Sequence, residues 1–475
     1  MNLSLKRPTR TAGQIQPGIL WGPFTLRVPF YHTRTQWPEL WQGMLVASAT
    51  GLALVPILMT DFGLGFEQAV ACVFIQAVLL SSTPILFGEP FAPGWITPAL
   101  PLALSFVAAQ HHGVDVYATP TEKFQIMTAV SLDFSLLVFL LGITGLGKRL
   151  IGWLPAALKG GIILGASIAA LKRVFLDDAH RFLYQQPVAT TLAISFCLIL
   201  TFSLPLQRYK LRFRSLAILA SLGLLPGFLI AALVGPLVAA PDLTAAGEAT
   251  REIVFQLEWG WIVPPFLETF QKVSPFWIGW PDWKMFVDGV PLALMGYVIV
   301  FGDLITGIEV LRAAEPDRAD EKIDINLNRS HFSLCIRNLL MGLFAPFFPT
   351  QGCLWTGVHV IVVQRWREGR QVMDSLFGGI ASYYVFGIPL LYLVKPLVTG
   401  LKPMMGIALS LTLVLTGFAC AYVAIGIPRT QIERGVTVLT AVALAIFNPW
   451  TGMAIGIAAV LLLVGIRSPD PARDH

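Results

Sequence analysis

The stretches FAPGWITPALPL at residues 91–102 and FFPTQGCLWTGVHVIVV at residues 347–363 decide the fold. Both open with proline, glycine and threonine and then pass into a short apolar run that suits a helix. Proline removes a backbone hydrogen bond, so neither opening is expected to be regular helix. In a membrane, such backbone is tolerated only where it is packed in protein or lines a cavity. The pair therefore predicts two interrupted membrane helices that meet at a central site.

The composition around these stretches is that of a membrane protein. Of the 475 residues, 55% are hydrophobic and 13% are charged, and the mean hydropathy is +0.70. Soluble domains carry about 25% charged residues, so a lipid bilayer is the expected environment. The net charge of +5 does not indicate a nucleic-acid partner, because the basic residues lie in short clusters between apolar runs. The five cysteines are scattered without a CxxC pair, so we expect no metal or cofactor.

The apolar runs predict an all-α integral membrane protein with fourteen transmembrane helices. A bilayer core about 30 Å thick requires about 20 apolar residues of helix. The expected spans are 41–60, 66–87, 90–110, 125–147, 150–171, 187–206, 215–239, 288–311, 332–347, 351–364, 376–396, 403–426, 431–447 and 448–466. Segments on the side of the two termini then carry most of the 33 lysines and arginines. The positive-inside rule therefore predicts cytoplasmic termini and a location in the cell (inner) membrane.

A long outer loop divides the chain into two halves. The aromatic-rich loop 241–287 is expected to lie at the lipid headgroups and separates a first repeat, 41–240, from a second, 288–466. Seven spans in each half force opposite orientations, which is the plan of inverted repeats. A cytoplasmic N-terminal segment, 1–40, and a cytoplasmic tail, 467–475, complete the expected organisation.

The interrupted third and tenth spans supply the candidate site. Two half-helix N-termini that face each other present N–H groups and positive dipole ends to an anionic or carbonyl-bearing solute. The candidate substrate-binding residues are Thr97, Pro98, Asp303, Thr350, Gln351, Gly352 and Thr356.

Three ionisable residues are candidates for ion coupling. Asp303 lies in mid-span, where a carboxylate is costly unless it is paired or wetted, and Glu89 and His359 lie beside the two interruptions. Each also has a structural interpretation. Asp303 fits an ion pair with another span, Glu89 a solvated loop, and His359 a buried histidine satisfied by a backbone carbonyl.

Three stretches resemble a known family. YVIVFGDLITGIEVL at 297–311, INLNRSHFSLCIRNLLMGLFAPFFPTQG at 325–352 and LKPMMGIALSLTL at 401–413 are similar to the xanthine/uracil permeases, the nucleobase–ascorbate transporters. The resemblance extends, more distantly, to sulfate permeases and bicarbonate/anion exchangers. It implies a core domain of spans 1–4 and 8–11, a gate domain of spans 5–7 and 12–14, substrate between spans 3, 8 and 10, an elevator-like movement, and a homodimer.

The resemblance implies a secondary active transporter, coupled to protons or sodium, for a small polar solute that is nucleobase-like or another organic solute. The alternative is a transporter or exchanger of a small anion, namely bicarbonate, sulfate or a carboxylate. Nucleobase permeases usually have a glutamate where Ile299 stands and an acidic or amide residue near Leu354. The missing glutamate favours the anion. No enzyme is expected, because the spans contain no HExxH or DxxD motif.

Overall fold

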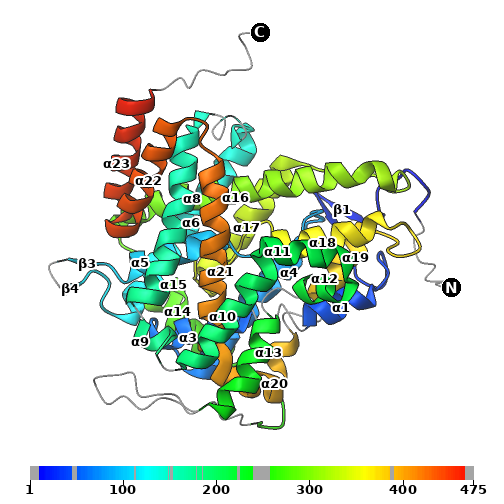
Figure 1. The fold of residues 1–475 in the computed structure, drawn as a ribbon, viewed down its shortest axis with the longest axis horizontal. Helices are drawn as coiled ribbons and strands as arrows, with labels where there is room; N and C mark the ends of the chain where they lie inside the picture. Colours follow the sequence, from blue (N-terminus) through cyan, green and yellow to red (C-terminus); the bar gives the residue numbers. More distant parts are fainter. Residues whose placement is uncertain are drawn as a thin grey trace.

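The computed structural model describes residues 10–44, 51–111, 114–147, 149, 153–177, 179–184, 186–221, 225–238, 257–385 and 390–465. Within these ranges helices dominate, and the strands form two short hairpins (Figure 1). Strand β1 (Ile19–Trp21) pairs with β2 (Phe24–Leu26), and β3 (Gln110–His111) pairs with β4 (Val114–Asp115). Residues 45–50 of the expected first span, residues 241–256 of the expected outer loop and the expected tail 467–475 lie outside the described residues.

In the first half of the chain, the helices fall within or close to the expected spans. They are α1 (Trp37–Gln42), α3 (Val55–Thr60), α4 (Phe66–Ile85), η2 (Thr97–Ala99), α5 (Leu100–Val107), α6 (Pro120–Thr144), α8 (Ala156–Lys172), α9 (Ala179–Phe182), α10 (Pro187–Phe202), α11 (Leu204–Arg212), α12 (Arg214–Ser221) and α13 (Leu225–Val234). The short helices η2 and α5 form the helical part of the third span. Pro93 precedes them, whereas Pro98 lies in η2 and Pro101 in the first turn of α5.

In the second half, most helices also fall within or close to the expected spans, whereas two short helices at Phe266–Val273 and Pro275–Ile278 lie within the expected outer loop. Its helices are α14 (Phe266–Val273), α15 (Pro275–Ile278), α16 (Trp283–Ala314), η5 (Glu315–Arg318), α17 (Leu327–Phe344), α18 (Thr356–Arg367), α19 (Leu376–Val385), η6 (Leu390–Leu393), α20 (Lys395–Leu401), η7 (Lys402–Met404), α21 (Met405–Gly426), α22 (Gln431–Ile446) and α23 (Pro449–Ala459). Helix α18 begins at Thr356, so the tenth span is also interrupted at its start, as the sequence predicted.

Local chemistry sets several of these boundaries. Thr119 caps α6 by accepting a hydrogen bond from the Glu122 N–H at 3.2 Å, and the Glu122 carboxylate accepts the Thr119 N–H at 2.9 Å. The same reciprocal pair, Thr430 with Glu433, begins α22. Each pair satisfies N–H groups that the first turn of a helix leaves free. Helix α6 ends at Gly145, whose φ of 65° is a conformation that favours glycine.

Four described helices are long and apolar enough to cross a membrane. They lie at Phe66–Ile85, Pro120–Thr144, Trp283–Arg318 and Lys395–Gly426. Shorter apolar helices occupy Thr97–Val107, Pro187–Phe202, Pro226–Leu237 and Pro449–Val464. The chain is therefore a multi-pass membrane protein, whereas the count of fourteen spans and the inverted repeat remain predictions.

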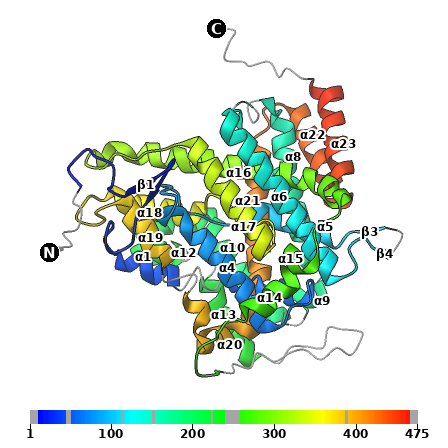
Figure 2. The same ribbon diagram turned by 180° about the vertical axis from the view of Figure 1, so that it is seen from behind.

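The helices pack in two groups. Helix α6 packs along α16 and α17, while α8 packs along α21 and α22 (Figure 2). Equivalent helices of the two halves make equivalent contacts. Helix α8 of the first half packs on α22 of the second, as α21 of the second half packs on α10 of the first. Within the halves, α10 packs on α13 as α22 packs on α23. Such equivalent contacts are what a repeat of seven helices would produce.

The described part of the outer loop carries a row of exposed aromatic side chains. Helix α14 is amphipathic, with Thr269 and Val273 buried and Leu267 exposed. The exposed aromatic residues of this region are Trp259, Trp261, Phe276, Trp277, Trp280 and Trp283. This arrangement agrees with a segment that lies along the membrane surface.

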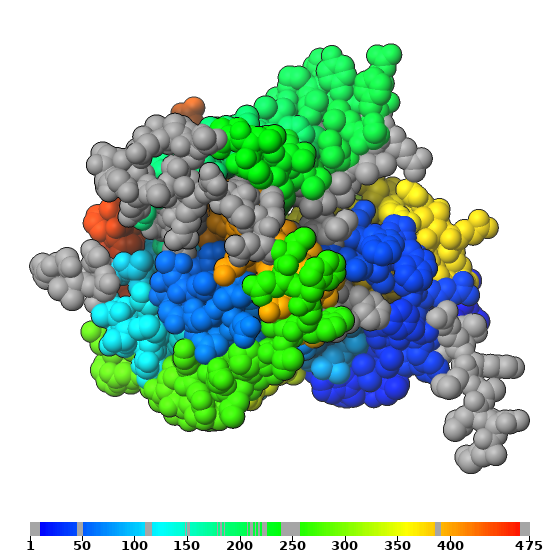
Figure 3. All heavy atoms as spheres, turned by 90° about the horizontal axis from the view of Figure 1, so that it is seen from below, coloured from blue at the N-terminus to red at the C-terminus, as the bar shows by residue number. Residues whose placement is uncertain are grey.

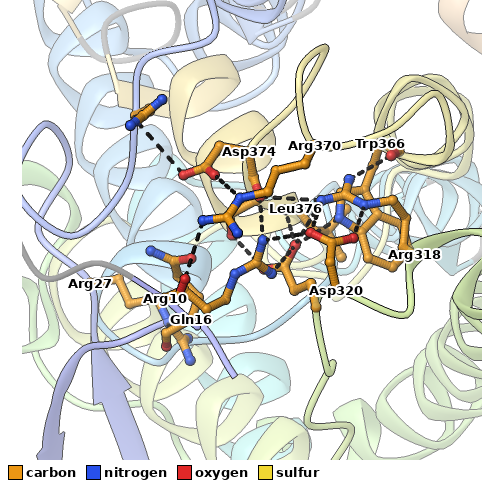
Figure 4. A network of polar contacts seen from close by, with 12 residues as sticks. Arg10, Gln16, Arg27, Arg318, Asp320, Trp366, Arg370, Asp374 and Leu376 are labelled. Carbon is orange, nitrogen blue, oxygen red and sulfur yellow. Dashed lines mark hydrogen bonds and ion pairs between the residues drawn. The ribbon is translucent and has the colours of Figure 1, made fainter. Parts of the chain in front are cut away.

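The N-terminal segment is fixed to the second half of the chain by a buried ionic network (Figure 4). Arg10 pairs with Glu321 at 2.9 Å and with Asp320 at 3.0 Å. Hydrogen bonds from Arg318 hold the pKa of the Asp320 carboxyl below its usual range. In the space-filling view, blue N-terminal residues accordingly lie beside the yellow residues of α18 and α19 at one end of the molecule (Figure 3). The network ties the first residues described to the loops after α16 and α18.

Candidate functional site

The two interrupted spans cross and pair through their backbones. The Gly352 N–H donates to the Gly94 carbonyl at 2.8 Å, and the Ile96 N–H donates to the Pro349 carbonyl at 2.9 Å. A third bond runs from the Trp355 N–H to the Ala92 carbonyl at 2.7 Å. These bonds satisfy polar groups that the missing helical turns would leave free, which is how irregular backbone survives at this depth.

Glycine is required where the two segments touch. A Cβ added at Gly352 would lie 2.6 Å from the Gly94 carbonyl oxygen and 3.0 Å from the Ile96 nitrogen. A Cβ added at Gly94 would lie 2.7 Å from the Trp355 Cβ. The close approach of the two backbones therefore depends on both glycines.

Substituting Gly352→Ala is expected to lower thermal stability and to abolish solute uptake. The new methyl group must separate the paired segments, and overpacking of this kind costs about 1–3 kcal/mol. Thermal unfolding of the purified protein and uptake into proteoliposomes measure the two effects. Gly435→Ala is the matched control, because nothing lies within 4 Å of a Cβ at Gly435 in α22. Equal behaviour of the two variants would contradict a tight crossing.

A cavity of about 680 Å³ opens at this crossing. Its walls come from α4, from the two interrupted segments, and from α16, α10 and α21. The lining residues with polar side chains include Gln76, Thr97, Thr201, Asp303, Thr306, Thr356, Tyr392, Thr412 and Thr416. Of the candidate binding residues, Thr97, Pro98, Asp303 and Thr356 line the cavity.

Both short helices present their first turns to the cavity. Thr97 begins η2, which continues into α5, and Thr356 begins α18. Neither helix start is capped by the side chain of its N-cap residue. The N-terminal N–H groups of a helix carry a partial positive charge. The start of α18 therefore gives this wall of the cavity a positive character. At the start of η2, Pro98 has no N–H, and the Ala99 and Leu100 N–H groups donate to the Ile96 and Thr97 carbonyls.

Asp303 lies on the α16 wall of the cavity. Within the described part of the chain, no residue forms a hydrogen bond or ion pair with its carboxylate. Thr306 stands one turn further along and also lines the cavity, while its hydroxyl donates to the Gly302 carbonyl at 2.9 Å. The structure thus places Asp303 where a bound solute or cation could reach it.

Two other candidates for ion coupling are engaged in structural contacts. His359 is buried, with Nδ1 accepting the Ala92 N–H at 3.4 Å and Nε2 lying 3.3 Å from the Gly307 carbonyl oxygen. Its ring therefore links α18 to the third span and to α16. Glu89 is also buried and pairs with Arg329 of α17 at 2.9 Å. Neither residue is among those that line the cavity.

The variant Glu89→Gln is expected to lower thermal stability while the ion dependence of uptake remains. The change leaves Arg329 buried beside a neutral partner, and breaking a buried pair costs about 3 kcal/mol or more. Arg329 retains Asp324 at 2.6 Å, which reduces that cost. Thermal unfolding and uptake at varied pH and sodium concentration measure the two effects.

Glu309→Gln provides the matched control for Glu89. Glu309 pairs with Arg312 at 3.3 Å in an exposed position, where an ion pair contributes little to stability. This variant should leave both measurements unchanged. Loss of ion dependence in Glu89→Gln without a loss of stability would instead make Glu89 a coupling residue.

The remaining candidates, Thr350, Gln351 and Gly352, lie behind the wall of the cavity. Thr350 is buried and donates to the Phe347 carbonyl at 3.0 Å. The Gln351 amide donates to the Gln76 carbonyl at 2.9 Å, while Asn338 donates to the Gln351 carbonyl at 3.0 Å. These residues hold the crossing in place and do not contribute to the cavity lining.

Arg337 of α17 lies behind the crossing and is fully buried. Its guanidinium donates to the Gln351 side-chain oxygen at 3.2 Å and to the Gly352 carbonyl at 3.0 Å. No carboxylate among the described residues lies within ion-pair distance of it. Gln76, which receives the Gln351 hydrogen bond, lines the cavity, as does Gly94, which pairs with Gly352. Gln351 therefore lies between the Arg337 guanidinium and Gln76 of the cavity wall, and Gly352 lies between this guanidinium and Gly94 of the wall.

Sequence reasoning missed several lining residues. Thr412 and Thr416 stand one turn apart on α21, and Gln76 lies in the apolar helix α4. The only available signal was polar side chains in apolar spans, which many membrane helices contain. Arg337 was also missed, although an arginine inside a predicted span is a recognised mark of function.

Comparison with known proteins identifies the fold. No known protein family matches the sequence, and no curated protein does. Among solved structures, that of SLC26A9 matches with 14% identity and a TM-score of 0.52, covering 90% of this chain and 65% of that chain. This chain thus spans less than two thirds of SLC26A9, and at such low identity the likeness concerns the fold.

Two further solved structures are similar to a lesser degree. The murine solute carrier 26 family member A9 anion transporter, in its inward-facing state, has 14% identity and a TM-score of 0.48, with 90% of this chain and 68% of that chain covered. The transmembrane domain of a cyanobacterium bicarbonate transporter, BicA, has 14% identity and a TM-score of 0.47, with coverages of 88% and 96%. The likeness in fold therefore rests on the structure of SLC26A9.

Proposed function

We propose that this protein is a secondary active transporter of a small anion, which binds in the cavity where the two interrupted spans cross. This alternative is favoured by Ile299, which stands where nucleobase permeases usually have a glutamate. The similarity in fold to SLC26A9, a protein described as an anion transporter, supports the choice.

The observation that carries the proposal is the positive charge at the crossing. Arg337 is buried behind it without a carboxylate partner among the described residues, and the N-terminus of α18 opens onto the cavity in front of it. A buried cation without a counterion is costly, so an arrangement that keeps one at a cavity wall favours a bound anion. A bound anion would balance the positive charge of Arg337.

Asp303 then supplies the ion coupling in this proposal. A carboxylate on the cavity wall repels an anion unless a proton or a sodium ion neutralises it. Anion and cation would therefore bind together and cross together, which is symport. Thr306 and the polar backbone around the crossing offer oxygen atoms that could help to hold a cation.

The packing of the helices supports an elevator-type movement. Asp303 of α16 belongs to one set of contacts, with α4, α6, α17 and α18, whereas α8, α10, α21 and α22 form the other. The helix α5 of the first interrupted segment packs on α8, at the boundary between the two sets. These sets agree with the core and gate domains that the family resemblance implied. In the proposal, the core carries the site across the bilayer against the gate.

The cavity lacks the polar side chains that are expected for binding a nucleobase. Ile299 and Leu354 both line the cavity, and these are the positions where acidic or amide side chains would accept the ring N–H groups of a base. A buried donor left without an acceptor costs about 1–3 kcal/mol, so the cavity is unfavourable for a classical uracil or xanthine.

The decisive experiment is uptake into proteoliposomes. Labelled bicarbonate, sulfate, a monocarboxylate and uracil are offered with and without a proton or a sodium gradient. Accumulation of an anion that depends on one gradient supports the proposal. Accumulation of uracil alone would contradict it.

A further inference from the structure

The cavity is much larger than an inorganic anion. Its volume is about 680 Å³, whereas a bicarbonate or sulfate ion fills roughly the space of two or three water molecules of about 30 Å³ each. Cavities of about 300–1,000 Å³ are typical for organic ligands. The size therefore favours a substrate with a substantial body.

The lining is predominantly apolar and aromatic. Trp95 and Trp355 flank the crossing. Phe202 of α10 and Tyr422 of α21 also line the cavity, with ring centroids 6.2 Å apart. The aliphatic lining residues include Val73, Leu80, Ile163, Ile299, Leu354 and Leu415. No lysine, arginine or histidine is among the described lining residues. A small, strongly hydrated anion would lose its water shell here and gain few hydrogen bonds in return.

The charged groups and the start of α18 lie at the crossing. Thr97 and Thr356 mark the two helix starts, and Thr306 and Asp303 face the cavity from α16. One end of a ligand would thus meet N–H groups, hydroxyls and the charge of Arg337. The rest of it would meet rings, aliphatic side chains and the neutral hydroxyls of Thr201, Thr412 and Thr416. The site thus has a charged end and a largely apolar remainder, which match the charged group and the apolar body of an amphipathic ligand.

We infer that the cargo is an organic monocarboxylate with an apolar body, of which an aromatic carboxylate such as benzoate is the simplest example. This inference rests on the proposed function and specifies its substrate. The carboxylate binds at the crossing in front of Arg337, and the ring packs against Trp355, Ile299 and Leu354. A single cation behind the crossing and a carboxylate beside it suit a monoanion better than a dianion.

The test uses the full chain reconstituted in proteoliposomes with labelled benzoate. We expect uptake that unlabelled hexanoate inhibits more strongly than acetate does, and that a tenfold excess of bicarbonate or sulfate leaves unchanged. The variant Trp355→Ala should raise the KM for benzoate about tenfold, because a ring stacked on the indole loses its contact. Trp283→Ala is the matched control, because Trp283 is 73% exposed at the start of α16 and does not line the cavity.

The outcomes separate this inference from the proposed function. Uptake of bicarbonate or sulfate, with benzoate neither carried nor inhibitory, would overturn the monocarboxylate and leave an anion transporter. Uptake of uracil without any anion would overturn both. An unchanged KM in Trp355→Ala would overturn the placement of the ring. Binding of labelled benzoate to the purified protein in detergent is measured in parallel, and its absence counts against the inference even where no flux is seen.

Discussion

Replacing Arg337 by glutamine is expected to raise the KM for anion uptake about thirtyfold. At an effective dielectric constant of about 20, a unit charge within about 8 Å of another contributes about 2 kcal/mol, which is roughly a thirtyfold change in affinity. The maximal rate should change less, because the variant removes a charge and leaves the lining of the cavity intact. Uptake at varied anion concentration in proteoliposomes measures both parameters.

Arg337→Lys is the matched variant. It retains the positive charge and loses the forked geometry that reaches both Gln351 and Gly352. If charge is what the site requires, the lysine variant keeps a KM close to that of the natural protein while the glutamine variant does not. Equal KM values in the two variants would show that Arg337 acts only by holding the crossing in shape.

Arg337→Gln is also expected to fold. Glutamine can still hydrogen-bond near the crossing, and a neutral amide costs less to bury than a charged guanidinium does. Thermal unfolding of the detergent-purified variant checks this point. A large loss of stability would remove the link between the KM change and the charge, and Arg337→Met would then be compared at a temperature where both proteins are folded.

Replacing Asp303 by asparagine is expected to abolish accumulation of the anion while exchange remains. Asparagine resembles the neutral form of the carboxyl group, so the anion still binds but no longer requires a cation. With one proton or sodium ion per anion, a tenfold ion gradient supports about tenfold accumulation, and the variant should reach no accumulation at all. Net uptake under a gradient and counterflow without one measure the two properties.

Asp133→Asn serves as the control for Asp303. Asp133 is a second carboxyl group within a membrane helix, on α6, but it does not line the cavity. Its loss should leave the ion dependence of uptake unchanged. Gradient-driven accumulation that persists in Asp303→Asn would place the coupling acid elsewhere.

Much of the architecture could be predicted because membranes restrict local structure severely. The apolar runs and their proline-rich interruptions located the helices, since backbone in lipid has few alternatives to a helix. The positions of α4, α16 and α21 agree with the expected spans. The starts at Thr97 and Thr356 follow directly from the Pro–Gly stretches before them.

The candidate site was predicted only in part. Thr97, Pro98, Asp303 and Thr356 line the cavity, whereas Gln351 lies behind it. Glu89 and His359 are near the interruptions in sequence, but each is used in a contact with another helix. A polar residue in a broken segment can face either side, and local sequence does not decide which.

By itself, therefore, the sequence determined that the chain lies in a membrane, where its helices run, and that two of them are broken. Only the tertiary structure decided that the two breaks pair through Gly94 and Gly352, and that Arg337 stands behind them. The reason is that hydropathy and proline act along the chain, within a few residues. The direction of a side chain and the charge that it meets depend on helices hundreds of residues away.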